Sequence, residues 1–109
     1  MKENFQTVTF EEKYAEESKN NADLKFALKI LKRAEIAHHS NDLDTAINLY
    51  KESIQTFPTA DAHTYLGWMY SLQGNIEEAI IECHNAIKID PDFGNPYNDI
   101  GCYLMQKKE

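Results

Sequence analysis

The sequence is poor in the features that mark membrane-spanning and secreted proteins. No stretch approaches the roughly 20 apolar residues that a bilayer-spanning helix needs. The first residues, MKENFQTVTF, lack the apolar core of a signal peptide. The two cysteines, Cys83 and Cys102, have neither CxxC spacing nor the density of a disulfide-stabilised secreted domain. We therefore expect a cytoplasmic protein with reduced thiols and no membrane contact.

Positive charge is scarce as well. The chain has 11 lysines and arginines against 18 aspartates and glutamates, which gives a net charge of -7 at pH 7. Nucleic acids and anionic membranes favour proteins that cluster lysine and arginine. We therefore expect no nucleic-acid partner, and a neutral, apolar or basic partner fits this charge better.

The motifs of common enzymes and metal sites are missing too. The sequence contains no glycine-rich phosphate loop, serine-nucleophile motif or pair of catalytic carboxylates. His38 and His39 are adjacent, so on a helix their side chains point about 100° apart and cannot readily share one metal ion. Cys102, His84 and Asp99 have the chemistry of a nucleophile, a base and an orienting acid, but nothing in the sequence brings them together. We expect no metal, no cofactor and no enzymatic activity within this chain.

What the sequence does contain is helical periodicity within a chain of 109 residues, the size of one small domain. The first long helix covers about Ala22 to His39, with Leu24, Leu28, Leu31 and Ala34 as its expected buried side. Four further helices follow. They begin near Leu43, Ala60, Ile76 and Asn95.

The breaks between these helices carry recognisable capping residues. Asn41 and Gly74 suit the left-handed position after a helix, and Asp42 and Thr59 suit the N-cap before the next one. Asn75 followed by a glutamate three residues later resembles a capping box. Before residue 20 the same kind of pair, Thr9 and Glu12, predicts a short acidic helix carrying Phe10 and Tyr14.

The helices form a repeat. Many positions recur after 33 residues, and others after 34, which is the mark of a stacked repeat architecture. The pairs at offset 33 include Ala34 with Gly67, Asn41 with Gly74, Ala46 with Ala79, Tyr50 with Cys83, and Pro58 with Pro91. Those at offset 34 are His63 with Tyr97, Leu66 with Ile100, and Gly67 with Gly101.

On these residues the chain resembles the tetratricopeptide repeat family. The central unit carries the family's pattern at five positions, with departures at His63, where the family has tryptophan, and Cys83, where it has phenylalanine. The matching residues are Leu66, Gly67, Tyr70, Ala79 and Pro91. The first unit is degenerate, and the third offers Tyr97, Ile100, Gly101 and Leu104 before the sequence stops. The resemblance covers about three quarters of the chain.

The resemblance implies an all-α fold, a right-handed superhelical array of antiparallel helix hairpins. We expect an N-terminal acidic segment at residues 1–20, a degenerate first repeat at 21–59, a second repeat at 60–93, and the first helix of an incomplete third repeat, or a capping helix, at 94–109. Within such a hairpin the two backbones approach closely. Gly67 is therefore expected to face Ala79, and Gly67→Leu is expected to unfold the domain.

In such an array the first helix of each unit lines a concave groove. The side chains that packing leaves free there are our candidates for binding a protein or peptide: Glu35, Asp61, Tyr65, Trp68, Leu72, Asn98, Asp99 and Cys102. Trp68 has two interpretations, an anchor exposed in the groove or a ring packed against a neighbouring helix. The clamp with which some tetratricopeptide domains hold acidic chaperone tails is disfavoured, because Glu35, Tyr65 and Asp99 at the matching sites lack positive charge.

The last helix has no second helix to close its hairpin, so we expect part of the surface around Ile100, Gly101, Tyr103 and Leu104 to lie bare. The chain is then a fragment of a longer array, or this helix is a final cap, or a second copy covers it. The leading hypothesis is a non-enzymatic protein-interaction module. The alternatives are a structural module that forms a homodimer through Tyr103 and Leu104, and a regulatory domain attached to an enzyme outside this chain.

Overall fold

The computed structural model describes residues 8–108, and this part of the chain consists of helices joined by short turns, without strands. Its helices are α1 (Phe10–Lys13), α2 (Ala15–Ser18), α3 (Ala22–His39), α4 (Leu43–Thr56), α5 (Ala60–Leu72), α6 (Ile76–Ile89) and α7 (Asn95–Lys107). In residues 8–108 no helix combines the length and the hydrophobicity required to cross a lipid bilayer.

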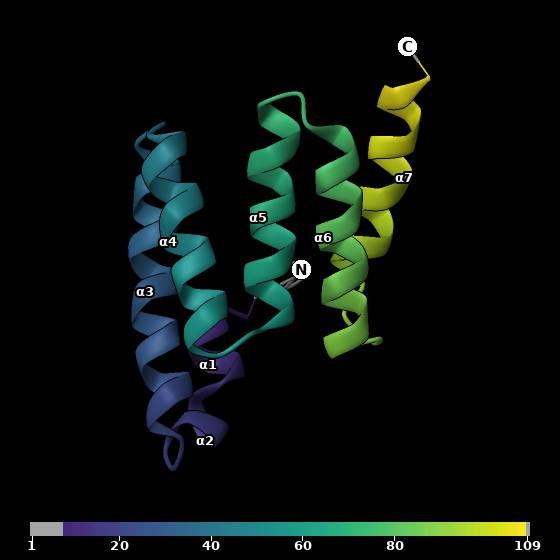
Figure 1. Ribbon diagram of the computed structural model, residues 1–109. Coiled ribbons are helices and arrows are strands. Elements are labelled where there is room, and N and C mark those ends of the chain that lie inside the picture. Colours follow the sequence, from purple (N-terminus) through teal and green to yellow (C-terminus); the bar gives the residue numbers. More distant parts are fainter. Residues whose placement is uncertain (1–7, 109) are drawn as a thin grey trace, which may run out of the picture.

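The five long helices stand side by side as successive hairpins (Figure 1). Helices α3 and α4 form one antiparallel pair, α5 and α6 form a second, and α7 packs against α6. The predicted all-helical array of hairpins is therefore confirmed. The side built by α3, α5 and α7, the first helices of the successive units, is called the inner wall below.

Most of the predicted turn chemistry is present. Asn41 and Gly74 have positive φ angles of 65° and 85°. The side chains of Asp42 and Thr59 each accept a hydrogen bond from the backbone N–H three residues ahead. The capping box expected at Asn75 is absent, because its side chain accepts no bond from the helix backbone and its amide instead lies 3.4 Å from the side-chain oxygen of Gln73.

The main core joins α3 to both neighbouring helices. Burying these side chains supplies most of the free energy that holds the hairpins together. Its fully or nearly fully buried members include Leu24, Leu28, Leu31 and Ala34 of α3, Ala46, Ile47 and Tyr50 of α4, and Ala62, Leu66 and Met69 of α5. All of the residues predicted as the buried side of α3 lie in this cluster.

A smaller core joins α6 to α7, and it corrects one expectation. Tyr103 is only 5% exposed because it packs on Ala79 and Cys83 of α6. The side chain expected to lie bare for self-association is therefore enclosed within the chain. Leu104, its neighbour, is 48% exposed as expected.

Gly67 lies where α5 and α6 come close together. A Cβ atom placed on it would lie 3.0 Å from the carbonyl oxygen of Ala79 and 3.3 Å from the Cβ of Glu82. His63, one turn earlier, lies 2.6 Å from a carboxylate oxygen of Glu82 through its Nδ1. The predicted contact between Gly67 and Ala79 is confirmed, and the missing side chain is what allows it.

The short N-terminal helices fold back onto the array. Thr9 and Glu12 form the expected capping box, with bonds of 3.1 and 3.2 Å. Phe10, which follows directly, is 5% exposed and belongs to the main core. The remainder of the predicted N-terminal segment, residues 1–7, lies outside the described residues.

Candidate functional site

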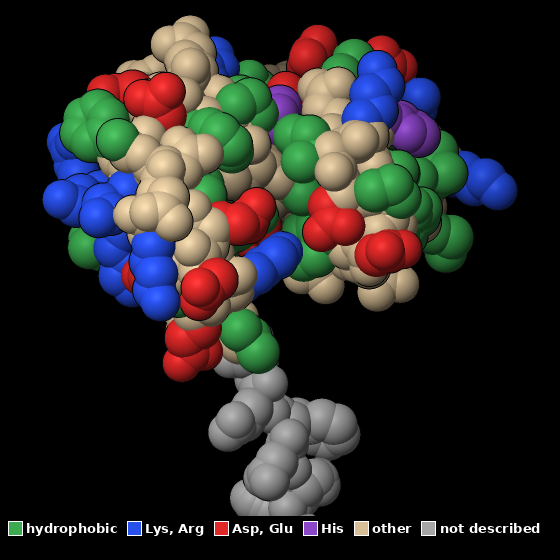
Figure 2. Space-filling model, turned by 90° about the horizontal axis from the view of Figure 1, so that it is seen from below, with side chains coloured by type: hydrophobic (Ala, Val, Ile, Leu, Met, Phe, Trp, Pro, Cys, Tyr) green, Lys and Arg blue, Asp and Glu red, His purple; other side chains and the backbone are tan. Residues whose placement is uncertain are grey.

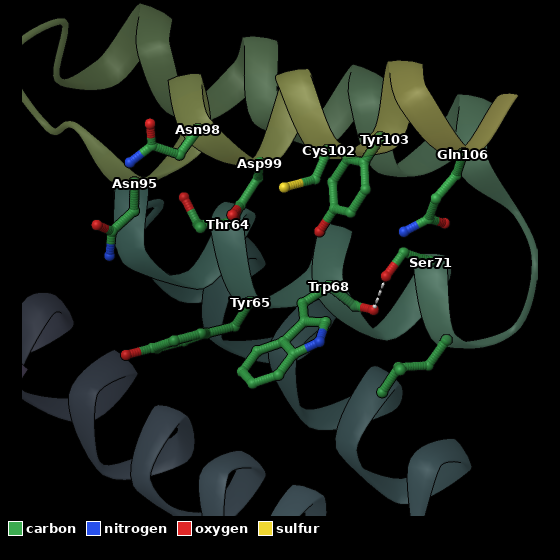
Figure 3. A pocket seen from close by; sticks show the side chains of 11 residues that line it. Thr64, Tyr65, Trp68, Ser71, Asn95, Asn98, Asp99, Cys102, Tyr103 and Gln106 are labelled. Carbon is green, nitrogen blue, oxygen red and sulfur yellow. Dashed lines mark hydrogen bonds between the residues drawn. The ribbon is translucent and has the colours of Figure 1, made fainter. Parts of the chain in front are cut away.

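A groove runs along the inner wall between α5 and α7 (Figure 3). It encloses about 650 Å³, within the usual range of ligand-binding pockets, roughly 300 to 1,000 Å³. Its lining comes from α5 through Thr64, Tyr65, Trp68, Ser71 and Leu72, and from α7 through Asn95, Asn98, Asp99, Cys102, Tyr103 and Gln106. We call this space the α5–α7 groove.

The side chains on the α5 side of the groove recur every three or four residues and so lie on one face of that helix. Tyr65 on this face also meets Tyr50 of α4, with ring centroids 5.7 Å apart. Two hydroxyls in it are satisfied within the helix, because Thr64 donates to the carbonyl oxygen of Ala60 at 2.8 Å and Ser71 to that of Trp68 at 2.7 Å. Those two hydroxyl protons are therefore not free to donate hydrogen bonds to a partner. Tyr65 is half-buried and Leu72 is exposed, so this side offers mainly apolar and aromatic surface.

Trp68 combines the two interpretations that its sequence position allows. One side of the indole meets His38 of α3 edge to face, with ring centroids 4.8 Å apart and an interplanar angle of 85°. The ring nevertheless remains 45% exposed and lines the groove. Trp68 is therefore oriented by the preceding hairpin while it stays accessible from solvent.

This contact makes a pH titration informative. Burial, followed by the charge of His39, lowers the pKa of His38 below its ordinary value, so the ring facing Trp68 is neutral at pH 7. Protonated imidazole quenches indole fluorescence. We expect the emission of Trp68, the single tryptophan, to fall on acidification with a midpoint below about 6.5. His38→Gln should abolish this step, and an unchanged titration in that variant would contradict the contact.

The α7 side is polar and includes the one charged residue of the lining. Asn95 and Asn98 are exposed amides, and Cys102 is an exposed thiol. Asp99 is partly buried, and that burial raises the pKa of its carboxyl group. The structure thus brings Tyr65, Trp68, Leu72, Asn98, Asp99 and Cys102 of the predicted site into one groove.

Asp61 lies elsewhere, beneath the N-terminal helices. It is 6% exposed, and its Oδ1 accepts hydrogen bonds from Lys13 at 3.0 Å and from the Tyr14 hydroxyl at 2.7 Å. Burial and this bond to Asp61 raise the pKa of Tyr14. Since its carboxylate is already occupied, we do not retain Asp61 in the exposed binding surface.

Glu35 lines a second cavity, of about 400 Å³, next to the α5–α7 groove. It pairs with Lys32 at 3.3 Å, and α1 forms another side of this cavity. Tyr65 and Asn95 line both spaces, so the two adjoin along the inner wall. The N-terminal helices therefore cover the part of the wall next to the groove.

Sequence reasoning missed this cover. Its signals were present, because Phe10 and Tyr14 lie four residues apart on one helical face, directly after the Thr9 cap. Nothing local, however, indicates that Lys13 reaches Asp61, 48 residues ahead. Gln106 was also missed as part of the groove lining.

The geometry offers little for catalysis or metal binding. In residues 8–108 no group of three or more histidine, cysteine, aspartate or glutamate side chains could hold a metal ion. Cys102 and Asp99 share the groove, whereas His84 on α6 does not line it. Burial raises the pKa of the Cys83 thiol to about 12, so that thiol is protonated at neutral pH.

The outer stripe of α7, formed by Tyr97, Gly101 and Leu104, is exposed in the structure. A Cβ on Gly101 would meet nothing within 4 Å, in contrast to Gly67 at the equivalent place on α5. No helix of residues 8–108 covers this stripe in the way that α6 covers the matching side of α5. The bare surface expected on the last helix is thus present at Gly101 and Leu104, but Tyr103 is buried and Ile100 packs partly against the smaller core.

Comparison with known proteins agrees with this geometry. The family model of the tetratricopeptide repeat matches residues 60–93, which contain α5 and α6. A search of curated proteins found no match. Repeats of this family generally mediate contacts between proteins and are typically not catalytic.

Proposed function

The chain carries a tetratricopeptide repeat at residues 60–93, and we propose that it is a non-enzymatic module that binds a peptide segment of another protein in the α5–α7 groove. The cytoplasmic location and the division into units at 21–59, 60–93 and 94–109 belong to the same proposal.

The accessible aromatic surface of the groove is the observation that carries this proposal. Tryptophan and tyrosine anchors dominate the energetics of many protein interfaces, since a large rigid ring buries much area at little entropic cost. Trp68 is 45% exposed at the groove, and its contact with His38 fixes its orientation. The ring is therefore positioned for binding before a partner arrives.

The test uses a phage-displayed library of random twelve-residue peptides against the immobilised chain. We expect selected peptides to bind Trp68→Ala at least about tenfold more weakly, because truncating a central aromatic anchor commonly costs 2 kcal/mol or more. Ile81→Ala is the matched control. Ile81 is a similarly exposed apolar residue, at 50%, but lies on α6 outside the groove.

Circular dichroism should show that both variants are folded. Peptides that bind Trp68→Ala as well as they bind the parent chain would place binding outside the groove. Failure to select any peptide would also count against the proposal.

The alternative is self-association through the outer stripe of α7. Gly101 supports it, since a glycine with open space on one side allows another helix to come as close as α6 comes to Gly67. In sedimentation velocity, a dimer that Leu104→Asp dissociates would favour this alternative. If the parent chain and Leu104→Asp both sediment as monomers, self-association is excluded.

A further inference from the structure

We infer that the peptide bound in the α5–α7 groove presents a lysine or arginine side chain to Asp99. This inference rests on the proposed function and names the chemistry of its partner.

The first argument is the charge of the groove. Asp99 is the one charged residue among the side chains that line it. No lysine, arginine or histidine of residues 8–108 forms a salt bridge with it. A partly buried carboxylate without a counter-charge attracts a cation more strongly than one in open solvent, because the surrounding dielectric constant is lower.

The second argument is the set of groups around Asp99. Tyr65 and Trp68 line the same space, and aromatic faces attract ammonium and guanidinium groups. The side chains of Asn95 and Asn98 extend beside Asp99 on α7 (Figure 3) and offer amide oxygens as acceptors for a cationic donor. An anionic side chain would find no positive partner in this lining.

The third argument is that the same wall already holds a lysine of this chain. The ammonium group of Lys13 lies 3.0 Å from Asp61 and 4.1 Å from the centre of the Phe93 ring. A carboxylate and an aromatic ring thus hold one cation in the cavity that adjoins the groove through Tyr65 and Asn95. Asp99 and the aromatic side chains of the groove offer the same two kinds of group, and no cation of residues 8–108 pairs with Asp99.

The distribution of basic residues leaves Asp99 open to such a partner. Many lysine and arginine side chains lie on the α3 side of the molecule, and fewer lie on the opposite side, as the view from below shows (Figure 2). On α7 itself, Lys107 pairs with Glu77 of α6 at 3.2 Å. No lysine or arginine of residues 8–108 lines the groove, so a cationic guest meets net negative charge there.

The experiment is a double-mutant cycle on a peptide from the random twelve-residue library. Peptides selected through Trp68 should be enriched in lysine or arginine. Replacing that residue by glutamine in the peptide, or introducing Asp99→Asn in the chain, should each weaken binding at least about tenfold, the effect of losing a hydrogen bond between charged groups. Applied together, the two changes should weaken binding little more than either one alone.

Glu52→Gln is the control, since it removes the same charge from an exposed position on α4, outside the groove lining. Peptides that depend on Trp68 but bind equally well to Asp99→Asn, or that are enriched in aspartate and glutamate, would overturn this inference and leave the proposed function standing. If no selected peptide binds the Trp68→Ala variant more weakly than the parent chain, both the inference and the proposed function are overturned.

Discussion

Gly67→Leu should lower the melting temperature by on the order of 10 °C, because overpacking of a core contact costs about 1–3 kcal/mol, and each kcal/mol shifts the midpoint of a small domain by roughly 4–8 °C. A Cβ alone would lie 3.0 Å from the carbonyl oxygen of Ala79, and backbone cannot move aside as a flexible side chain can. The rest of a leucine side chain requires α5 and α6 to separate.

The repeat supplies the control for this prediction. Gly101 stands 34 residues after Gly67, at the same place in its unit, but a Cβ there would meet nothing within 4 Å. Gly101→Leu should therefore raise the melting temperature slightly, since leucine is favoured over glycine in an exposed helix by up to about 1 kcal/mol.

Thermal unfolding followed by circular dichroism distinguishes the two outcomes. If the melting temperature fell equally in both variants, close approach of a neighbouring helix would not explain why glycine is required at Gly67. If the melting temperature fell only in Gly101→Leu, and the parent chain sedimented as a dimer, a second copy would cover α7.

Much of the array could be predicted from sequence, because the information that sets it is local or periodic. Asn41 and Gly74 mark their turns by residue type alone, since a positive φ angle favours asparagine and glycine. The 33-residue offset that relates Ala46 to Ala79 then places successive hairpins in register. Neither inference requires knowledge of distant contacts.

The parts that escaped prediction depend on distant contacts. The rotation of α7 about its axis decides that Tyr103 packs on Cys83 while Leu104 faces solvent, and an amphipathic pattern alone does not fix that rotation to within one residue. Trp68 likewise owes its position to His38, which belongs to the preceding hairpin. The site was therefore predicted as a surface, but the accessibility of its members was not.

Phe10→Ala is expected to release the N-terminal helices from the inner wall. Truncating a buried phenylalanine typically costs 3–5 kcal/mol, and Phe10 is 5% exposed. The remaining ties are weaker. Lys13 is 31% exposed in its pair with Asp61, and Lys32 and Glu11 are about half exposed in theirs, so solvent screens both interactions.

Native-state hydrogen exchange measures this release directly. The amides of Lys13 and Tyr14, which bond to the carbonyl oxygens of Thr9 and Phe10, should exchange on the order of 100-fold faster in Phe10→Ala. Amides of the α5–α6 hairpin should keep their protection. Val8→Ala is the control, because Val8 is apolar, two residues away and 61% exposed.

Which amides lose protection from hydrogen exchange in Phe10→Ala shows whether the N-terminal helices are a separable cover or part of the main core. Loss confined to α1 and α2 would show that they form a separable cover, whose removal exposes Asp61 and extends the α5–α7 groove along the wall through Tyr65 and Asn95. Equal loss in every helix would instead make Phe10 an integral part of the main core. In the first case, peptides that contain lysine should bind Phe10→Ala at a second site. The reason is that Lys13, which pairs with Asp61 in the parent chain, would leave with the N-terminal helices and free that carboxylate.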